Sequence, residues 1–330
     1  MSNDKDFVVA GAVEVGKDTK VTLGTVTSSN IDLATGNYFA DTLAADTTYT
    51  ISNAGDVQAF QLEVTGGVGE YYALANASYS GANLDTSGQQ VLAYGLAFKT
   101  DGTALYVCGS SPDSVFQYTL TTAWDLSTAS YASKTKSVSS EDTDPTGLFF
   151  KSDGTKMYVV GRSNDRVYQY TLSTAWDVST ATYLQDFSVA AQESSPWGIY
   201  FKSDGLELYL VGDNNDRVRK YTLTTAWDLS TASYANVEFI VSTPTSEGQP
   251  NGIFFKPDGT KMYISGSQGD SVYELELSTA WDITTASYAD VNFSVASQET
   301  APRGVAFSSD GDRMYIVGAN GGGDVHEYTG

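Results

Sequence analysis

The catalytic chemistry open to this chain is narrow, because its 330 residues include one cysteine, Cys108, and one histidine, His326. A single cysteine forms no intrachain disulfide and no thiolate metal cluster. A single histidine excludes a zinc site built on several His and Cys ligands, and a Ser-His-Asp triad would depend on that one imidazole. Carboxylates remain plentiful, with 40 Asp and Glu, so a glycosidase-type pair of acids is still possible.

Acidic residues gather just before a recurring Pro-x-Gly motif. They are Glu141, Asp142, Asp144, Glu193, Glu247 and Glu299. No spacing among them singles out a catalytic pair, and few other residue types remain to do chemistry. We therefore predict a protein that is not an enzyme, with a glycan-cleaving enzyme as the alternative.

A second set of candidates occupies the middle position of the Pro-x-Gly motif, which differs between copies of an otherwise well-kept repeat. The occupants are Tyr94, Thr146, Trp197, Asn251 and Arg303. Such side chains stack on sugars and hydrogen-bond to them, so we predict a ligand-binding rim, joined by Arg162 and Asp213 from a neighbouring variable loop. Unconstrained drift of exposed loops explains the variation equally well.

Aspartates also recur two residues before a strand-like run. They are Asp113, Asp165, Asp216 and Asp270. A ring of carboxylates suits Ca²⁺, but an Asx-type turn, in which the side chain accepts from nearby backbone N–H groups, better explains a residue that returns in every copy. We predict no cofactor, with Ca²⁺ as the open alternative.

All these residues are positioned by a repeat of about fifty residues. Its turn aspartates Asp101, Asp153, Asp204, Asp258 and Asp310 are spaced 52, 51, 54 and 52 residues apart. Each copy holds a G-x-x-F run, an Asp-Gly hairpin turn, two further strand-like runs, a W-D-x-S-T turn and a last strand such as 187–189. No copy has a helical apolar period. This pattern predicts an all-β fold, a five-bladed β-propeller of four-stranded blades over residues 71–330.

The ends of the repeat predict how the ring closes. The fifth copy ends after its third strand, whereas residues 76–79 match the opening of the fourth strand in other copies. Residues 77–87 should therefore complete the last blade and hide its edge. A glycine begins the G-x-x-F run of every copy, which suits a crowded channel. These glycines are Gly95, Gly147, Gly198, Gly252 and Gly304.

The motif P-D-G-T-K-M-Y followed by V-Y-x-x-x-L resembles the YVTN/NHL type of propeller repeat, and the resemblance covers residues 77–330. A five-bladed ring of near-identical repeats is also similar in plan to the tachylectin-2 type of lectin. That second likeness is an analogy of fold alone.

Residues 1–70 do not share the repeat, and we predict a small β-rich attachment domain there. The pattern from Asp32 to Thr65 resembles a β module of marine tailed-phage structural proteins, and Asp6 to Asp18 is similar to the attachment segment of fibre proteins. The resemblance implies a virion fibre or decoration protein, a homotrimer docked on other virion proteins, whose propeller binds host-surface glycan or protein. A spacer without a ligand is a third option.

Net charge excludes other partners. The 18 Lys and Arg against 40 Asp and Glu give a charge of -22, which argues against nucleic-acid binding and against an anionic membrane surface. The N-terminal stretch does not resemble a secretory signal, and no apolar run reaches the roughly 18 residues of a membrane span. We expect synthesis in a host cytoplasm, location in the virion and no membrane insertion.

Overall fold

The computed structural model describes residues 74–320 and 322–330, and before them only the backbone of five short strands. The chain divides into two compact units, Met1–Tyr71 and Tyr72–Gly330. In the first unit, β1 (Leu23–Thr25), β3 (Tyr38–Leu43) and β5 (Gln61–Gly66) form a parallel sheet, and β2 (Asn30–Asp32) pairs with β4 (Thr50–Ser52). The predicted attachment segment, residues 6–18, lies outside the described residues.

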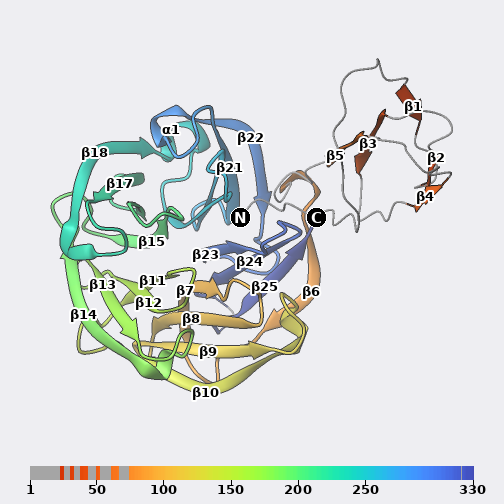
Figure 1. Ribbon diagram of the computed structural model, residues 1–330. Helices are drawn as coiled ribbons and strands as arrows, with labels where there is room; N and C mark the ends of the chain where they lie inside the picture. Colours follow the sequence, from red (N-terminus) through yellow and green to blue (C-terminus); the bar gives the residue numbers. More distant parts are fainter. Residues whose placement is uncertain are drawn as a thin grey trace. The chain divides into compact units, whose positions relative to one another are not determined.

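The second unit is a ring of five four-stranded antiparallel sheets (Figure 1), which confirms the predicted propeller. Blade one contains β7 (Leu92–Phe98), β8 (Ala104–Ser110), β9 (Ser114–Leu120) and β10 (Ala129–Ser137). Blade two contains β11 (Pro145–Phe150), β12 (Lys156–Gly161), β13 (Arg166–Leu172) and β14 (Ala181–Ser188). Blade three contains β15 (Pro196–Phe201), β16 (Glu207–Gly212), β17 (Arg217–Leu223) and β18 (Ala232–Ile240). Blade four contains β19 (Pro250–Phe255), β20 (Lys261–Gly266), β21 (Ser271–Leu277) and β22 (Ala286–Ser294).

Blade five contains β23 (Pro302–Phe307), β24 (Arg313–Gly318), β25 (Val325–Thr329) and, from the start of the ring, β6 (Ser78–Leu84). β6 pairs with β25 so that Tyr79 lies opposite Tyr328. The predicted closure is confirmed. The fourth strands of blades one to four are longer than expected, since each begins directly after the W-D-x-S-T turn rather than several residues later.

The remaining described elements are short helices. They are η1 (Leu74–Asn76), the 3₁₀ turns Leu126–Thr128, Val178–Thr180, Leu229–Thr231 and Ile283–Thr285, and α1 (Ser242–Thr245). No helix in the described part of the chain is long and apolar enough to cross a membrane.

The repeat motifs explain how each blade folds. The Asp-Gly turn needs a positive φ, and Gly154 has φ +72°. The indole of Trp176 packs directly on this glycine, because a Cβ there would lie 2.4 Å from the ring. Asp177 then caps the 3₁₀ turn by accepting from Ser179 N at 3.1 Å. The Trp-Asp pairs are therefore structural.

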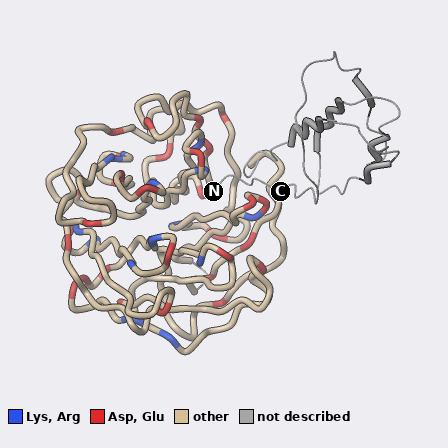
Figure 2. Tube along the Cα trace, viewed as in Figure 1, with Lys and Arg blue, Asp and Glu red and all other residues tan. Residues whose placement is uncertain are grey.

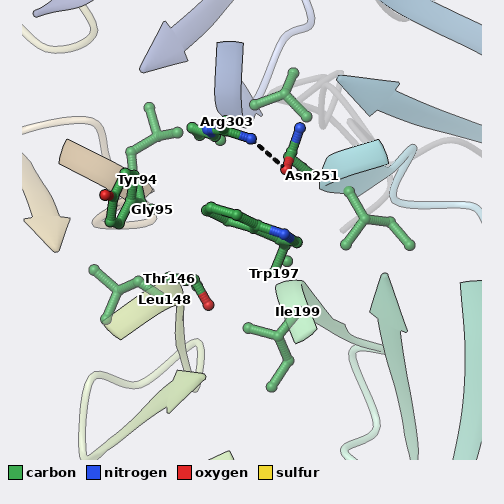
Figure 3. Close-up of a pocket in the computed structure, with 15 residues that line it drawn as sticks. Tyr94, Gly95, Thr146, Leu148, Trp197, Ile199, Asn251 and Arg303 are labelled. Atoms are coloured by element: carbon green, nitrogen blue, oxygen red, sulfur yellow. Dashed lines mark hydrogen bonds between the residues drawn. The ribbon is translucent and has the colours of Figure 1, made fainter. Parts of the chain in front are cut away.

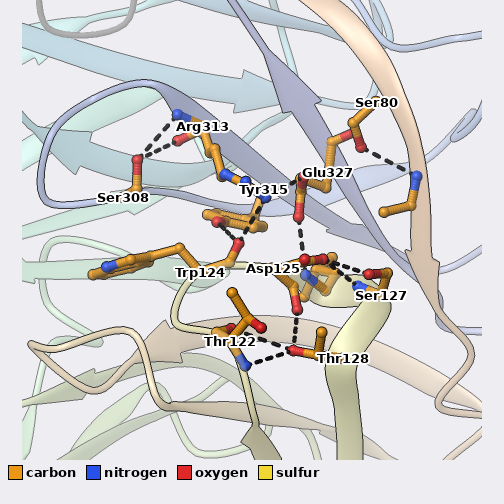
Figure 4. Close-up of polar contacts among 12 residues, drawn as sticks. Ser80, Thr122, Trp124, Asp125, Ser127, Thr128, Ser308, Arg313, Tyr315 and Glu327 are labelled. Atoms are coloured by element: carbon orange, nitrogen blue, oxygen red, sulfur yellow. Dashed lines mark hydrogen bonds and ion pairs between the residues drawn. The ribbon is translucent and has the colours of Figure 1, made fainter.

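Neighbouring blades are joined by tyrosines of the second strand. The Tyr106 hydroxyl donates to the Trp176 carbonyl of the next blade at 2.6 Å, and Tyr209 donates to the Trp281 carbonyl at 2.7 Å. Tyr315 makes the same bond to Trp124 and thereby links blade five to blade one (Figure 4). The Glu327 carboxylate strengthens this junction, since it accepts from Leu126 N at 3.0 Å.

The channel is as crowded as the inner-strand glycines predict. A Cβ on Gly147 would lie 2.4 Å from the Trp197 carbonyl of the next blade, and one on Gly304 would lie 2.9 Å from the Tyr94 carbonyl across the junction of blades five and one. Real Cβ atoms do not approach so closely. Only glycine lets five inner strands converge here.

Candidate functional site at the channel mouth

The five variable residues of the Pro-x-Gly motif line one pocket at the mouth of the channel (Figure 3). A shared backbone feature brings them together. In each blade the first two strands lose register at this position, so that Pro145 faces Gly161 and Gly147 faces Val160, with Thr146 between them unpaired. Such a β-bulge redirects one side chain. The same irregularity recurs in the other four blades.

Trp197 fills the mouth. It is 2% exposed, and the Tyr94 ring meets it edge-on with centroids 5.5 Å apart. The Arg162 and Arg303 guanidinium carbons lie 4.2 and 4.4 Å from the centre of its ring, at cation–π distance. The remaining cavity is about 20 Å³, room for one water-sized group. The rim therefore differs from the expected one, because this indole offers no open face on which a sugar can stack.

Arg303 is a partly buried cation without a carboxylate partner in the described part of the chain. One of its terminal nitrogens donates to Asn251 Oδ1 at 2.8 Å and to Ser267 Oγ at 3.1 Å, both neutral acceptors. Its buried Nε has no partner, and neither does Nε1 of Trp197. Burial lowers the pKa of Arg303. Two buried N–H donors thus remain unsatisfied at the mouth.

The other rim residues divide into scaffold and accessible groups. Thr146 and Asn251 are buried and bonded to the frame, Thr146 through a 3.0 Å bond to the Pro196 carbonyl. Arg162 is held by the Asp144 carboxylate at 2.6 and 2.7 Å. The partly exposed polar groups of the rim are therefore Arg162, Asp213 and Arg303.

The acids before the Pro-x-Gly motif include a buried carboxylate in each of blades two to five, which ties two loops together. Asp142 accepts from the backbone N–H groups of Asp144, Ser163 and Asn164 at 2.9 to 3.2 Å. The glycine that ends the second strand makes room for this carboxylate, since a Cβ on Gly161 would lie 2.3 Å from it. That glycine recurs in every blade and was the sequence signal for this role. We did not use it. The equivalent acids are Glu193, Glu247 and Glu299. At 2% exposure or less, these four are structural and do not form a glycosidase pair in contact with a substrate.

Blade five breaks this pattern. A strand residue bonds the buried carboxylate in blades two, three and four, through Tyr168, Arg219 and Tyr273. In blade five the equivalent residue is His326, and both its Nδ1 and Oε2 of Glu299 lack partners. Burial raises the pKa of Glu299 and lowers that of His326. Blade one has Gln90 in place of the acid.

The recurring aspartates lie in the loop between the second and third strands. Asp165, Asp216 and Asp270 adopt left-handed φ values of 51°, 54° and 46°. Their carbonyls, and that of Asp113, accept from a valine N–H after the fourth strand. The described residues contain no group of three or more His, Cys, Asp or Glu that could hold a metal ion. The fold thus uses these residues in turns, and the absence of a cofactor, with Ca²⁺ as the alternative, stays a prediction.

Cys108 is the chain's one cysteine and is fully buried in β8. Burial raises the pKa of its thiol to about 12. It is a small core residue.

The solved structures similar to this chain share little sequence identity with it. A putative 6-phosphogluconolactonase from Bacteroides uniformis is 16% identical, with a TM-score of 0.42, over 68% of this chain and 63% of that one. A protein from Lactobacillus plantarum is 14% identical, with a TM-score of 0.44, over 69% and 64%. A luciferin-regenerating enzyme is 12% identical, with a TM-score of 0.48, over 76% and 95%. The first four structures in this comparison are matched over 62 to 65% of their length. No curated protein matches the chain.

A family model described as "Lactonase, 7-bladed beta-propeller" matches residues 18–322. The ring described here has five blades, two fewer than that description states. The family is named after an enzyme activity. The prediction that the protein is not an enzyme is therefore wrong. Because the match spans most of the sequence, the chain belongs to this family of lactonase propellers.

Proposed function

We propose that this protein is a hydrolase that opens the ring of a sugar-derived lactone at the channel mouth. Family membership over residues 18–322 carries the proposal. The rim groups support it, because they supply two cations over the Trp197 ring, Arg162 and Arg303, and the Asp213 carboxylate, whose charge acts on Arg303. These are the two kinds of group that ester hydrolysis by water requires.

The proposed roles follow from charge. Asp213 accepts a proton from a water molecule as the water oxygen bonds to the lactone carbonyl carbon. The carbonyl oxygen becomes an oxyanion that Arg303 stabilises. When the tetrahedral intermediate collapses, the ring C–O bond breaks, and the departing alkoxide takes the proton back from Asp213. The product is the open-chain hydroxy acid, with all atoms of lactone and water retained.

The size of the mouth limits how a substrate binds. A cavity of about 20 Å³ holds no sugar ring, so the lactone must lie on the rim above Trp197, with its carbonyl directed to the guanidinium groups. Asp213 and Arg303 are both partly exposed, and a substrate resting on this surface reaches them.

The experiment is acid release from glucono-δ-lactone at constant pH, with spontaneous hydrolysis subtracted. Wild-type protein should accelerate it, and Asp213→Asn should lower kcat by about 10² or more, the usual share of a general base. Asp290→Asn, at an exposed bulge in blade four, is the matched control and should keep full activity. Equal rates with and without wild-type protein would rule out this substrate, and equal rates for both variants would rule out Asp213 as the base.

A second proposed function is attachment to a surface. The filled mouth favours it, because a rim with one water-sized opening suits contact with a polymer better than enclosure of a small molecule. In that role the chain is a virion protein, a homotrimer docked through residues 1–70, whose propeller binds host glycan or protein, with avidity supplied by many copies. Retention on host cells without release of reducing ends or acid would favour this function over hydrolysis.

A further inference from the structure

Blade five is closed by a strand that is not continuous with the rest of the blade. In blades one to four the fourth strand follows the third directly through the W-D-x-S-T turn, whereas β6 reaches β25 from the start of the ring. The Ser78 hydroxyl donates to the Thr329 carbonyl, 251 residues further along the chain. Because residues 85–91 connect β6 forward to β7 and not to β25, this closing strand can separate from β25 without distorting a turn between them.

The closing strand β6 pairs with β25 mainly at its two ends. The paired residues are Ser78 and Tyr79 at the start and Asn83 and Leu84 at the end. The residues between them bulge out of the ladder around Gly81, whose φ is +89°. In blade two the corresponding bulge of β14 contains Leu184 alone. An edge strand with an interrupted ladder opens at a lower free-energy cost than the core of the ring.

His326 of β25 lies beneath this closing strand. Asn83 is opposite it in register, and the Tyr79 ring meets the imidazole edge-on with centroids 6.0 Å apart. The histidine is 7% exposed, and its Nδ1 is buried without a hydrogen-bond partner in the described part of the chain. Release of β6 would therefore return the imidazole to water.

The ionisable groups around His326 do not stabilise a positive charge on it, although the ring is predominantly acidic (Figure 2). The neighbouring elements supply the carboxyls Glu299 before β23, Asp324 before β25 and Asp85 after β6, which acts on Asp324, and β24 supplies the apolar Ile316. Arg303 and Asp270 act on Glu299. Burial lowers the pKa of His326, and none of these carboxylates offsets it. A proton on His326 is thus unfavourable in the closed ring and favourable once water reaches the ring nitrogen.

From this arrangement we propose that the closing strand is a pH-sensitive latch: a proton taken up by His326 releases β6 from β25 and opens blade five, while blades one to four stay folded. The imidazole has its ordinary pKa of 6.5 when β6 is released and a lower one when β6 covers it. Closure is therefore at full strength above pH 6.5. As the pH falls towards the lowered pKa, the opening equilibrium rises by up to about tenfold per pH unit. This switch goes beyond the proposed hydrolase and does not depend on it.

The test is hydrogen–deuterium exchange of the full-length protein between pH 5.5 and 7.5, with each rate divided by the intrinsic rate at that pH. Protection of residues 78–84 should fall about three- to tenfold on going to pH 5.5. Residues 129–137, the fourth strand of blade one, are the internal control and should keep their protection, because Phe116 occupies the histidine position there.

Two variants show whether His326 is the group that responds. His326→Phe copies blade one, and His326→Tyr copies Tyr168 of blade two, so one is available if the other fails to fold. Both should keep residues 78–84 equally protected across the pH range. Burial raises the pKa values of Glu299 and Asp324, so their protonation opposes release, and Glu299→Gln should preserve or enlarge the loss seen in the wild type.

Three results overturn the proposal. The first is equal protection of residues 78–84 at pH 5.5 and 7.5 in the wild type. The second is the wild-type loss persisting in the His326 variants, which would assign it to the carboxyls. The third is a parallel loss in residues 129–137, which would mean that the whole ring unfolds.

Discussion

The hydroxyl of Tyr106 in the first blade donates a 2.6 Å hydrogen bond to the main-chain carbonyl of Trp176 in the second. Tyr158 makes the equivalent bond to the Trp227 carbonyl at 2.8 Å, but that carbonyl also accepts from Lys156 and Gln169. The same tyrosine-to-carbonyl hydrogen bond thus joins neighbouring blades at several junctions, but the number of side chains that donate to the carbonyl differs between junctions.

This difference gives the first prediction. Tyr106→Phe leaves the Trp176 carbonyl without its side-chain donor and should lower the free energy of unfolding by about 1–2 kcal/mol. Tyr158→Phe leaves two donors to the Trp227 carbonyl in place, so its loss in the free energy of unfolding should be only a few tenths of the loss for Tyr106→Phe. Urea unfolding followed by tryptophan fluorescence measures both. Equal losses would mean that the hydroxyl bonds do not determine the strength of the junctions.

The second prediction concerns the crowding of the channel. Gly147→Ala would place a Cβ 2.4 Å from the Trp197 carbonyl, so the inner strands of blades two and three must separate. We expect a loss of about 1–3 kcal/mol, as for other overpacked sites. Gly88→Ala is the control, because nothing lies within 4 Å of its added Cβ. A Gly147 variant as stable as the Gly88 variant would contradict this close approach of the strands.

Repetition explains what could be predicted from the sequence. Turn glycines, tryptophans and inner-strand glycines return in successive copies, so their spacing defines the strands and the ring closure, and the motif position before Gly198 places Trp197 at the mouth. The burial of Trp197 was not predictable. It results from Arg162 and Arg303, which reach its ring from two other blades, and no local pattern encodes a contact of that kind.

The same limit applies to the acids. Sequence proximity grouped Glu193 and Glu299 with partly exposed acids such as Glu141, although the first two are buried and bonded to loop amides. What distinguishes them is a glycine some twenty residues further on, at Gly212 and Gly318, whose missing side chain leaves the space for the carboxylate. Such a pair is recognised only when the register of two strands is known.

The third prediction concerns the ion pair between Glu193 and Arg219 inside blade three, whose side chains are 0% and 5% exposed. Arg219→Leu leaves a buried carboxylate without its cation and should cost about 3–5 kcal/mol in the free energy of unfolding. Adding Glu193→Gln should recover part of that loss, because blade one folds with Gln90 at this position. Arg217→Leu, which breaks a more exposed pair with Glu238, should cost less than about 1 kcal/mol. If Arg219→Leu is as mild as Arg217→Leu, the buried pair contributes nothing.

The fourth prediction is a pH dependence caused by Glu299. Burial raises the pKa of this carboxyl above its ordinary value of 4.5, so the folded protein binds a proton that the unfolded chain has already released. Stability due to this group is therefore present below pH 4.5 and is lost as the pH rises through the raised folded pKa. Glu299→Gln removes the ionisation while keeping an oxygen that accepts from Ala301 N, as the glutamate does at 2.6 Å. The difference in urea midpoint between variant and wild type should shift in favour of the variant as the pH rises from 4 to 8.

His326 acts in the opposite direction, since its lowered pKa makes the fold less stable as the pH falls below 6.5. The variant His326→Phe separates the two effects, and blade one already has a phenylalanine, Phe116, at the equivalent position. A Glu299→Gln difference that stays constant with pH would show that this carboxyl has a partner in solution.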